Sequence, residues 1–235
     1  MRRHFTRTVR SFVKRDGRVT VSQKRALDKL LPVFSIPKEE LSGLSKIFTG
    51  SRSSYLEIGF GNGDNLVKQA KLRPDSDFFG CEIYQSGIGR TLIQIKSMGI
   101  DNIRILVGDV VELVANFPSD SIDGIYIFFP DPWPKRRHHK RRLINRDFLR
   151  VLTGKMKDHA QLFMTTDDED YAHEIVNLVE RDDSLQNIAG NLSFSPRPSW
   201  RGVTRFERRA QSKGANIFEI IASLSTSSFC HKKEK

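Results

Sequence analysis

The sequence predicts an α/β fold in which a parallel, doubly wound sheet is closed at one edge by an antiparallel strand pair. Three observations predict it. From Ser53 onward, short apolar runs alternate with segments of helical periodicity. A glycine-rich turn follows the first apolar run, and two late apolar runs have no helix between them. The length of 235 residues suits one large domain, or a domain with a short arm.

The elements follow one another in a regular order. Strands are predicted at 54–60, 77–83, 102–109, 122–130 and 161–167, and the late pair at 191–194 and 216–224. Helices are predicted at 65–72, up to about Met98, through Asn116, at 143–156 and at 169–181. Because a helix separates each of the first five strands from the next, these strands are expected to be parallel.

Positive charge is concentrated in two segments. Residues 1–29 contain ten Lys or Arg against two acids, and residues 135–142 contain six Lys or Arg. Since the net charge is +11, the rest of the chain is slightly acidic. Two such patches favour a polyanionic partner, although solvated surface runs are the alternative.

The charge pattern also divides the chain. A basic arm is predicted at 1–31, a main domain at 32–225 and a polar tail at 226–235. The arm is too charged to form a core alone, so we expect it to be mobile or to dock on the domain or on a ligand.

Several classes of protein are disfavoured. The chain has no apolar stretch of about 18 residues and no apolar region after its basic start, so no membrane segment or secretory signal is expected, and a cytoplasmic location is the default. A transit peptide is not excluded. Cys81 and Cys230 lack metal-ligand spacing, and His138 and His139 lack metal-site partners, so no metal is predicted.

The glycine-rich turn is the first candidate site. Gly59, Gly61 and Gly63 stand in "EIGFGNG", where the first strand turns into a helix. Glycines there let the backbone pass close beneath a ligand, with helix amides nearby. A tight turn without a ligand is the alternative.

Three acids near this turn narrow the kind of ligand. Glu57 precedes the glycines, Glu82 ends the second predicted strand and Asp109 ends the third. The carboxyl ends of adjacent parallel strands surround a nucleoside in such sheets. Negative charge repels a pyrophosphate but tolerates a cationic sulfonium. The acids therefore favour S-adenosylmethionine over NAD, while each acid taken singly is equally consistent with a solvated strand end.

A fourth acid stands beside the second basic segment. Asp131 follows the fourth predicted strand in "DPWP", where two prolines stiffen the turn. Such a turn can hold a carboxylate and the indole of Trp133 in fixed positions. Trp133 is expected either to stack on a base or to pack under the loop.

Four segments carry a resemblance to a known family. "EIGFGNG", "GDVVEL", "FFPDPWPKRRHHKRRL" and "TRFERRA" together resemble the bacterial tRNA (guanine-N7-)-methyltransferases, the TrmB family. The N-terminal "RTVRSFVKRDGRVTVSQ" is similar too, so the resemblance runs from about Arg7 to Leu224. It implies a class I, Rossmann-like, seven-stranded methyltransferase. The implied activity is transfer of a methyl group from S-adenosylmethionine to N7 of a guanine in the tRNA variable loop, which gives 7-methylguanosine.

The resemblance also implies roles for individual residues. It implies that S-adenosylmethionine binds near Glu57, Glu82, Asp109 and Asp131, and that Asp131 is the catalytic residue. The implied RNA-contacting residues are Arg137, His138, His139, Lys140, Arg141 and Arg142. The positions matching the guanine site are Lys135, Asp167, Thr204, Arg205, Phe206 and Glu207.

One segment departs from the family. Before the last strand the family often has a Gly-His pair and Trp-Asp, whereas this chain has "SKGANIFEI" with Phe218-Glu219. We assign no chemistry to that segment. Two other functions stay open: a different S-adenosylmethionine-dependent transferase acting on an amine or DNA base, and an RNA-binding module without turnover. The four retained acids argue against the second. The protein is expected to be a monomer or a homodimer.

Overall fold

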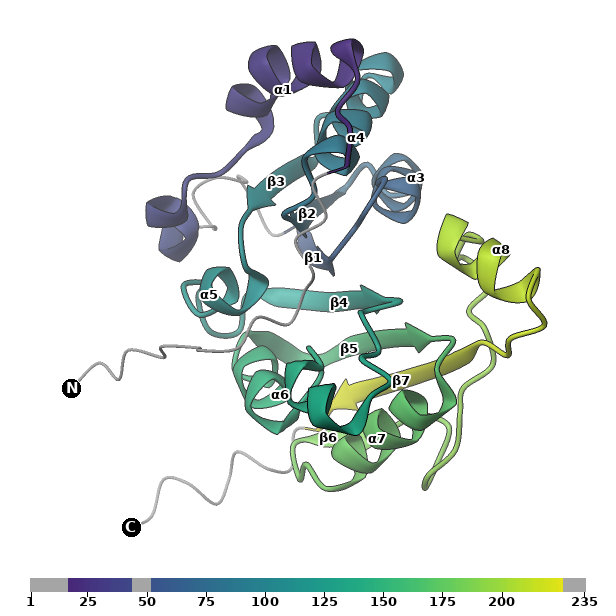
Figure 1. Ribbon diagram of the computed structural model, residues 1–235. Helices are drawn as coiled ribbons and strands as arrows, with labels where there is room; N and C mark the ends of the chain where they lie inside the picture. The colour runs from purple at the N-terminus through teal and green to yellow at the C-terminus, as the bar shows by residue number, and fades with distance from the viewer. Residues whose placement is uncertain (1–16, 44–51, 226–235) are drawn as a thin grey trace.

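The computed structural model describes residues 17–43 and 52–225. They form a seven-stranded sheet in the order β3-β2-β1-β4-β5-β7-β6 (Figure 1). The strands are β1 Ser53–Ile58, β2 Ser76–Glu82, β3 Ile103–Val107, β4 Ile122–Phe128, β5 Met156–Thr166, β6 Leu185–Asn187 and β7 Phe218–Leu224. β1 to β5 pair in parallel, and β7 runs antiparallel to both β5 and β6. The predicted parallel sheet with an antiparallel edge is confirmed.

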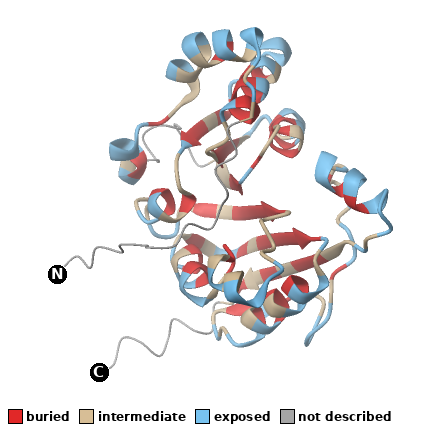
Figure 2. Cartoon of the chain, viewed as in Figure 1, coloured by how far each residue is buried: buried red, intermediate tan, exposed pale blue. Residues whose placement is uncertain are grey.

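Helices cover both faces of this sheet. α1 Val21–Phe34, α3 Asp64–Leu72 and α4 Gln85–Met98 share one buried apolar cluster with it, and α5 Val110–Val114, α6 Arg146–Thr153 and α7 Glu169–Glu180 share the other. The short elements are η1 Lys38–Gly43, η2 Arg136–Arg141 and α8 Arg205–Gln211. Figure 2 shows buried strands and helices whose outer sides are exposed. None of the helices in the described ranges is long and apolar enough to cross a bilayer.

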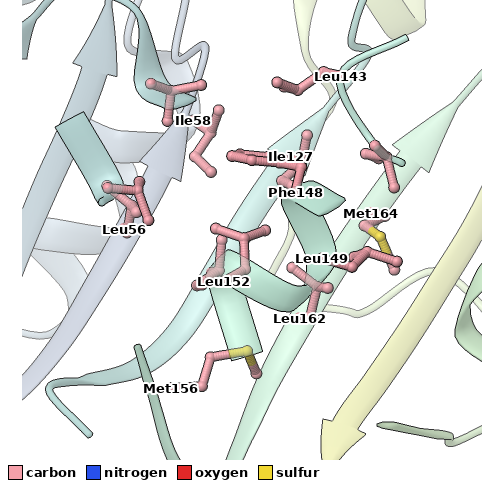
Figure 3. Close-up of a cluster of buried hydrophobic side chains, with 14 of the residues drawn as sticks. Leu56, Ile58, Ile127, Leu143, Phe148, Leu149, Leu152, Met156, Leu162 and Met164 are labelled. Atoms are coloured by element: carbon pink, nitrogen blue, oxygen red, sulfur yellow. The ribbon is translucent and has the colours of Figure 1, made fainter. Parts of the chain in front are cut away.

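The larger apolar cluster anchors the strands that lead to the site. Figure 3 shows its central part, built from Leu56, Ile58, Ile127, Leu143, Phe148, Leu149, Leu152, Met156, Leu162 and Met164. The strand members alternate along β1 and β5, so their side chains point to the same face. This packing holds the carboxyl ends of β1 and β4 side by side.

The strand order creates a switch point at β1. β1 pairs with β2 on one side and with β4 on the other. The chain therefore builds β2 and β3 outward from β1, then returns to build β4 and β5 on its other side. Ligands of open α/β sheets bind at the carboxyl end of such a switch point.

The late region differs from the prediction in its first strand and in the helix α8, which lies between the two late runs where no helix was predicted. Residues 191–194 do not form a strand, and the sheet is closed by β6 at Leu185–Asn187 instead. The side-chain amide of Asn187 donates to the carbonyls of Gly190 and Ser193, at 2.8 and 3.0 Å, which folds 187–193 into a turn. This side-chain bonding replaces the ladder that the apolar residues suggested.

The last part of the predicted arm is a helix. α1 runs across residue 31 to Phe34, and Thr20 begins it with a capping box in which Gln23 takes part. Ala26 is buried against α4, so this part docks on the domain, one of the two outcomes expected. Residues 1–16 and the predicted tail, 226–235, lie outside the described residues.

Candidate active site

The glycine turn joins β1 to α3 in a conformation that requires glycine. Gly59, Gly61 and Gly63 have φ angles of 70°, 56° and 76°. Glycine adopts these left-handed values without strain. A Cβ atom on Gly63 would also lie 2.3 Å from the hydroxyl oxygen of Thr91 on α4. The turn therefore lies close against α4.

Glu57 is buried at the end of β1. The residue is 4% exposed, and its carboxylate accepts a hydrogen bond from the side-chain amide of Asn65 at 2.8 Å. Burial raises the pKa of Glu57 to about 8, opposed by the Asn65 hydrogen bond and assisted by the negative charges of Asp64 and Glu82. A cation placed beside Glu57 would favour its ionised form.

Glu82 and Asp109 stand at the carboxyl ends of the next two strands. One carboxylate oxygen of Glu82 accepts from the backbone N–H of Gly61 at 2.8 Å, which ties the strand end to the glycine turn. Its other oxygen accepts from the backbone N–H groups of Ile83 and Tyr84. Asp109 caps α5 by accepting from the Val111 N–H at 3.0 Å. Both carboxylates remain half-exposed.

A pocket brings together some of the predicted cofactor and substrate residues, whereas Gly63, Glu82, Asp109, Asp131, Lys135, Asp167 and Glu207 are not among the residues that line it. Its walls are Glu57, the turn from Gly59 to Asn62, the end of β4 at Phe128 and Phe129, and the start of α8 at Thr204 to Phe206. The ring of Phe206 lies 3.8 Å from the point that a Cβ atom on Gly61 would occupy. The start of α8 therefore lies over the glycine turn.

The loop after β4 begins at this pocket wall and includes Asp131, which does not itself line the pocket. Phe129 and Trp133 both have positive φ angles, 52° and 50°, so the loop is bent on either side of Asp131. Phe129 N–H donates to the carbonyl of Thr165 on β5 at 2.8 Å. Asp131 is half-exposed and follows the wall residue Phe129 by two positions.

Trp133 packs within the basic segment. The guanidinium of Arg141 lies 4.9 Å from the centre of the Trp133 ring, and His138 contacts the same ring edge-on. The indole is half-exposed. These contacts do not decide between the two expected roles of Trp133, and base stacking stays a prediction.

Arg142 differs from the RNA contact that the resemblance implied. Its side chain is 1% exposed and pairs with Glu174 and, at 2.6 Å, with Asp170, both on α7. Its Nε donates to the carbonyl of Pro132 at 2.8 Å. A guanidinium engaged in this way cannot grip a phosphate, so Arg142 belongs to the interior, directly behind the Asp131 loop.

The rest of the basic segment faces solvent. Lys135, Arg136, Arg137 and Lys140 are exposed, and His138 and His139 are half-exposed. The pKa of His138 is lowered, mainly by desolvation and next by the positive charges of Arg141 and Arg137. A lowered pKa favours the neutral imidazole. His139, Asp170 and Glu174 lie close enough together to hold a metal ion, but the guanidinium of Arg142 already pairs with both carboxylates.

The remaining predicted substrate residues lie on two elements. Asp167 is exposed directly after β5, and its neighbour Asp168 caps α7 by accepting from Tyr171 N–H at 2.8 Å. Thr204 caps α8 by accepting from the Glu207 N–H at 3.1 Å. Arg205 and Phe206 are exposed on α8, beside the pocket.

Glu207 lies in the interior, unlike its neighbours on α8. Its side chain is 1% exposed, and its carboxylate pairs with Arg201 at 2.6 Å and with Arg197 at 3.5 Å. Arg201 is itself fully buried and also pairs with Glu219 on β7. A contact between Glu207 and a base would require these pairs to open, so its position argues for a structural role.

Sequence reasoning missed Arg201 and the function of Glu219. Arg201 reaches carboxylates 6 and 18 positions along the chain, and no local pattern marks such a pairing. The acid in "SKGANIFEI" was the available signal, since an acid in an otherwise apolar strand needs a partner when it is buried.

Comparison with known proteins places this geometry in a family. A family model described as "Putative methyltransferase" matches residues 51–220. The tRNA (guanine-N(7)-)-methyltransferase of Methylobacillus flagellatus is 43% identical over 218 residues, which cover 92% of this chain and 91% of that protein. The enzyme of the same name from Alkalilimnicola ehrlichii is 39% identical over 218 residues, with 91% and 92% coverage. The chain belongs to the tRNA (guanine-N(7)-)-methyltransferase family.

Solved structures support the same fold for this family member. The 16S rRNA (adenine(1408)-N(1))-methyltransferase from Catenulisporales acidiphilia, solved with its cosubstrate SAM, superposes with a TM-score of 0.56 at 15% identity, covering 82% of this chain and 93% of that one. The aminoglycoside resistance methyltransferase NpmB1 gives a TM-score of 0.54 at 16% identity, covering 80% and 94%. At these identities the likeness concerns the fold alone, and the predicted class I methyltransferase fold is confirmed.

Proposed function

We propose that this protein is an S-adenosylmethionine-dependent tRNA (guanine-N7-)-methyltransferase that forms 7-methylguanosine in the variable loop. The observation that carries the proposal is the pocket at the switch point. The glycine turn, Glu57 and the start of α8 line it, and the Asp131 loop with its basic segment begins at its wall. The names of the 39–43% identical relatives agree with this activity.

The residues around the pocket fit the cofactor. Glu57 is a buried carboxyl with a raised pKa, and such a group gains from a cationic ligand beside it. Glu82 and Asp109 offer half-exposed carboxylates at neighbouring strand ends, where ribose hydroxyls and an adenine amine can donate to them. When bound, S-adenosylmethionine supplies an electrophilic methyl group on a sulfonium.

Asp131 has an orienting and electrostatic role in the proposal. Guanine N7 carries a lone pair and no proton, so its attack on a methyl carbon needs no general base. The methylated purine is cationic, and its N1 proton is more acidic. A fixed carboxylate can accept from the N–H edge of the base and stabilise the charge that develops. Asp167, at the end of β5, is the second acid available for this edge.

The exposed part of the basic segment would hold RNA beside the reacting base. Lys135, Arg136, Arg137 and Lys140 follow Asp131 within nine positions and face solvent. Cations so placed can pair with phosphates of the bound loop. Because the proposed substrate is tRNA, we place the enzyme in the cytoplasm.

One experiment tests the activity and separates it from the two alternatives. Purified protein is incubated with labelled S-adenosylmethionine and unmodified tRNA, and the RNA is digested for base analysis. We expect label in 7-methylguanine. Label in another base, or transfer to an amine or to DNA instead, would identify a different transferase. Tight tRNA binding without any transfer would indicate an RNA-binding module.

A further inference from the structure

The outer face of α8 carries positive charge without compensating acids. Arg205, Arg208 and Arg209 on the helix and Lys213 just after it are exposed. Between Arg197 and Lys213 the sequence has a single acid, Glu207, and this acid is buried in its pair with Arg201. The charged side chains that this segment presents to solvent are therefore all cationic.

The cations of α8 also lie close to one another. Arg205 stands three and four positions before Arg208 and Arg209, the spacings at which like charges on a helix repel. The ion pairs found among the described residues include none with Arg208, Arg209 or Lys213. A short helix with this repulsion is unfavourable by itself, and a bound polyanion would relieve the cost.

The interior holds α8 in place despite that repulsion. Arg201 joins Glu207 on α8 to Glu219 on β7, and Thr165 on β5 donates to Glu219 at 2.7 Å. The carbonyl of Trp200 accepts from Lys68 and Gln69 on α3. The cationic face is therefore fixed relative to the sheet before any ligand arrives.

The position of α8 relates this face to the pocket. Thr204 to Phe206 form one pocket wall, and the cationic residues continue along the helix from there. Another wall ends at Phe129, from which the chain continues to Asp131 and the exposed cations at 135–140. Two separate cationic segments thus lead away from the same pocket. Figure 1 shows α8 as a separate element beyond the carboxyl ends of β4 and β5.

We propose that Arg208, Arg209 and Lys213 form a second phosphate-binding surface for RNA, so that the substrate is held by cations from two sides of the pocket. This inference rests on the proposed function, since it takes tRNA as the polyanion. The basic segment after Asp131 and the face of α8 would contact different phosphates, because they belong to different walls of the pocket.

The test is a charge-neutralising pair of substitutions with a matched control. The variant is Arg208→Gln with Arg209→Gln, and the control is Lys96→Gln with Arg181→Gln. Lys96 and Arg181 are exposed at the C-terminal ends of α4 and α7. These helices run back toward the amino ends of the parallel strands, opposite the carboxyl ends where the pocket lies. Both variants lose two charges, so a general effect of net charge appears equally in each.

Equilibrium binding to unmodified tRNA is measured over a range of salt concentrations, together with cofactor binding by calorimetry. For the α8 variant we expect affinity to fall about ten-fold or more, and the slope of log affinity against log salt to shrink by roughly 0.7–0.9 per lost phosphate contact. The control should stay within about two-fold of the wild type, and cofactor affinity should be unchanged in both.

Two results would overturn the inference. One is equal tRNA affinity and salt slope in the α8 variant and the control. The other is failure of Arg208→Lys with Arg209→Lys to restore binding, because lysine keeps the charge. Binding is read without turnover, so the proposed function is judged separately. If the wild type transfers no methyl group to tRNA, the proposed function is wrong. If transfer is normal and the α8 variants bind tRNA like the wild type, only the proposal of a second phosphate-binding surface is wrong.

Discussion

Glu57 and Glu82, at the ends of β1 and β2, differ in burial and in hydrogen bonding. Glu57 is buried beside a single amide donor, and its pKa is raised to about 8. Glu82 accepts three backbone N–H groups and stays half-exposed. Burial disfavours the charged form of a carboxyl, and a nearby cation favours it. The site therefore includes a carboxyl, that of Glu57, whose ionisation would respond to a cationic ligand.

Replacing Asp131 should separate chemistry from cofactor binding. We expect Asp131→Asn to lower methyl transfer by about 10²–10³-fold or more, because a group that stabilises developing charge is removed. Cofactor affinity should fall only modestly. Single-turnover transfer to tRNA and calorimetry measure the two effects. Asp75→Asn, at an exposed turn before β2, serves as the control. Near-normal turnover in Asp131→Asn would contradict the assignment of Asp131 as the catalytic residue.

Glu57 should link cofactor binding to pH. With a pKa of about 8, its carboxyl is mostly protonated at pH 7 in the free protein. A cation bound nearby lowers that pKa, so binding releases a proton. Affinity for S-adenosylmethionine should then rise with pH up to about 8 and level off above it. Calorimetry in buffers of different ionisation enthalpy counts the protons. Glu57→Gln should release none, and an unchanged proton count in that variant contradicts the mechanism.

At the scale of elements, the basic segment and α7 form one unit behind the Asp131 loop. η2 presents its cations to solvent, while the next residue, Arg142, turns inward to two acids of α7. The same guanidinium donates a hydrogen bond to the carbonyl of Pro132, the residue after Asp131. The loop that would carry the catalytic acid is thus fixed from the interior by a residue of the basic run.

Arg142→Gln should therefore affect both stability and turnover. The buried hydrogen bond to Pro132 and the pairs with α7 would be lost, at a cost of about 1–3 kcal/mol in the free energy of unfolding. Turnover should fall more than cofactor affinity, because the loop loses its anchor. Denaturant unfolding and the transfer assay measure these effects. Lys140→Gln removes a neighbouring exposed charge and should stay within about 0.5 kcal/mol. Equal behaviour of the two variants would refute the anchoring role.

At the scale of the whole molecule, positive charge is concentrated in a few segments of the chain. The chain outside residues 1–29 and 135–142 is slightly acidic in sum, and positive charge is concentrated in the N-terminal segment, the segment after Asp131 and the face of α8. The first of these reaches the described structure as α1, which packs on α4. In the proposed function, the carboxylates at the strand ends would hold the nucleoside of the cofactor, and the cations would contact the RNA.

Binding to tRNA should depend steeply on salt. If the four exposed cations at 135–140 each contact one phosphate, affinity should fall by roughly 50–150-fold between 50 and 200 mM salt. Released counterions are the physical reason. Titrations of tRNA at several salt concentrations measure the slope, and cofactor binding, which should change little, is the control. A tRNA affinity that does not change with salt concentration would contradict the role of the basic segment in RNA binding.

The sequence alone predicted the parts that depend on local pattern. Apolar runs alternating with helical periodicity predicted the parallel sheet, and chain order then put Glu57, Glu82 and Asp109 at neighbouring strand ends. The positive φ angles of Gly59, Gly61 and Gly63 agree with the turn expected from their spacing. The short strand at 191–194 was wrong, because side-chain hydrogen bonds of Asn187 outweighed the preference of so few residues.

The direction of individual side chains was decided by the tertiary structure. In the sequence Arg142 is one cation of six, and Glu207 stands among arginines on a short helix. Packing turns both inward, Arg142 to acids 28 and 32 positions away and Glu207 to Arg201. A charge enters the interior only where a partner from another element meets it, since desolvation is otherwise too costly. Local pattern therefore determined the elements of the candidate site, and contacts between distant residues determined which charges face solvent and which are buried in ion pairs.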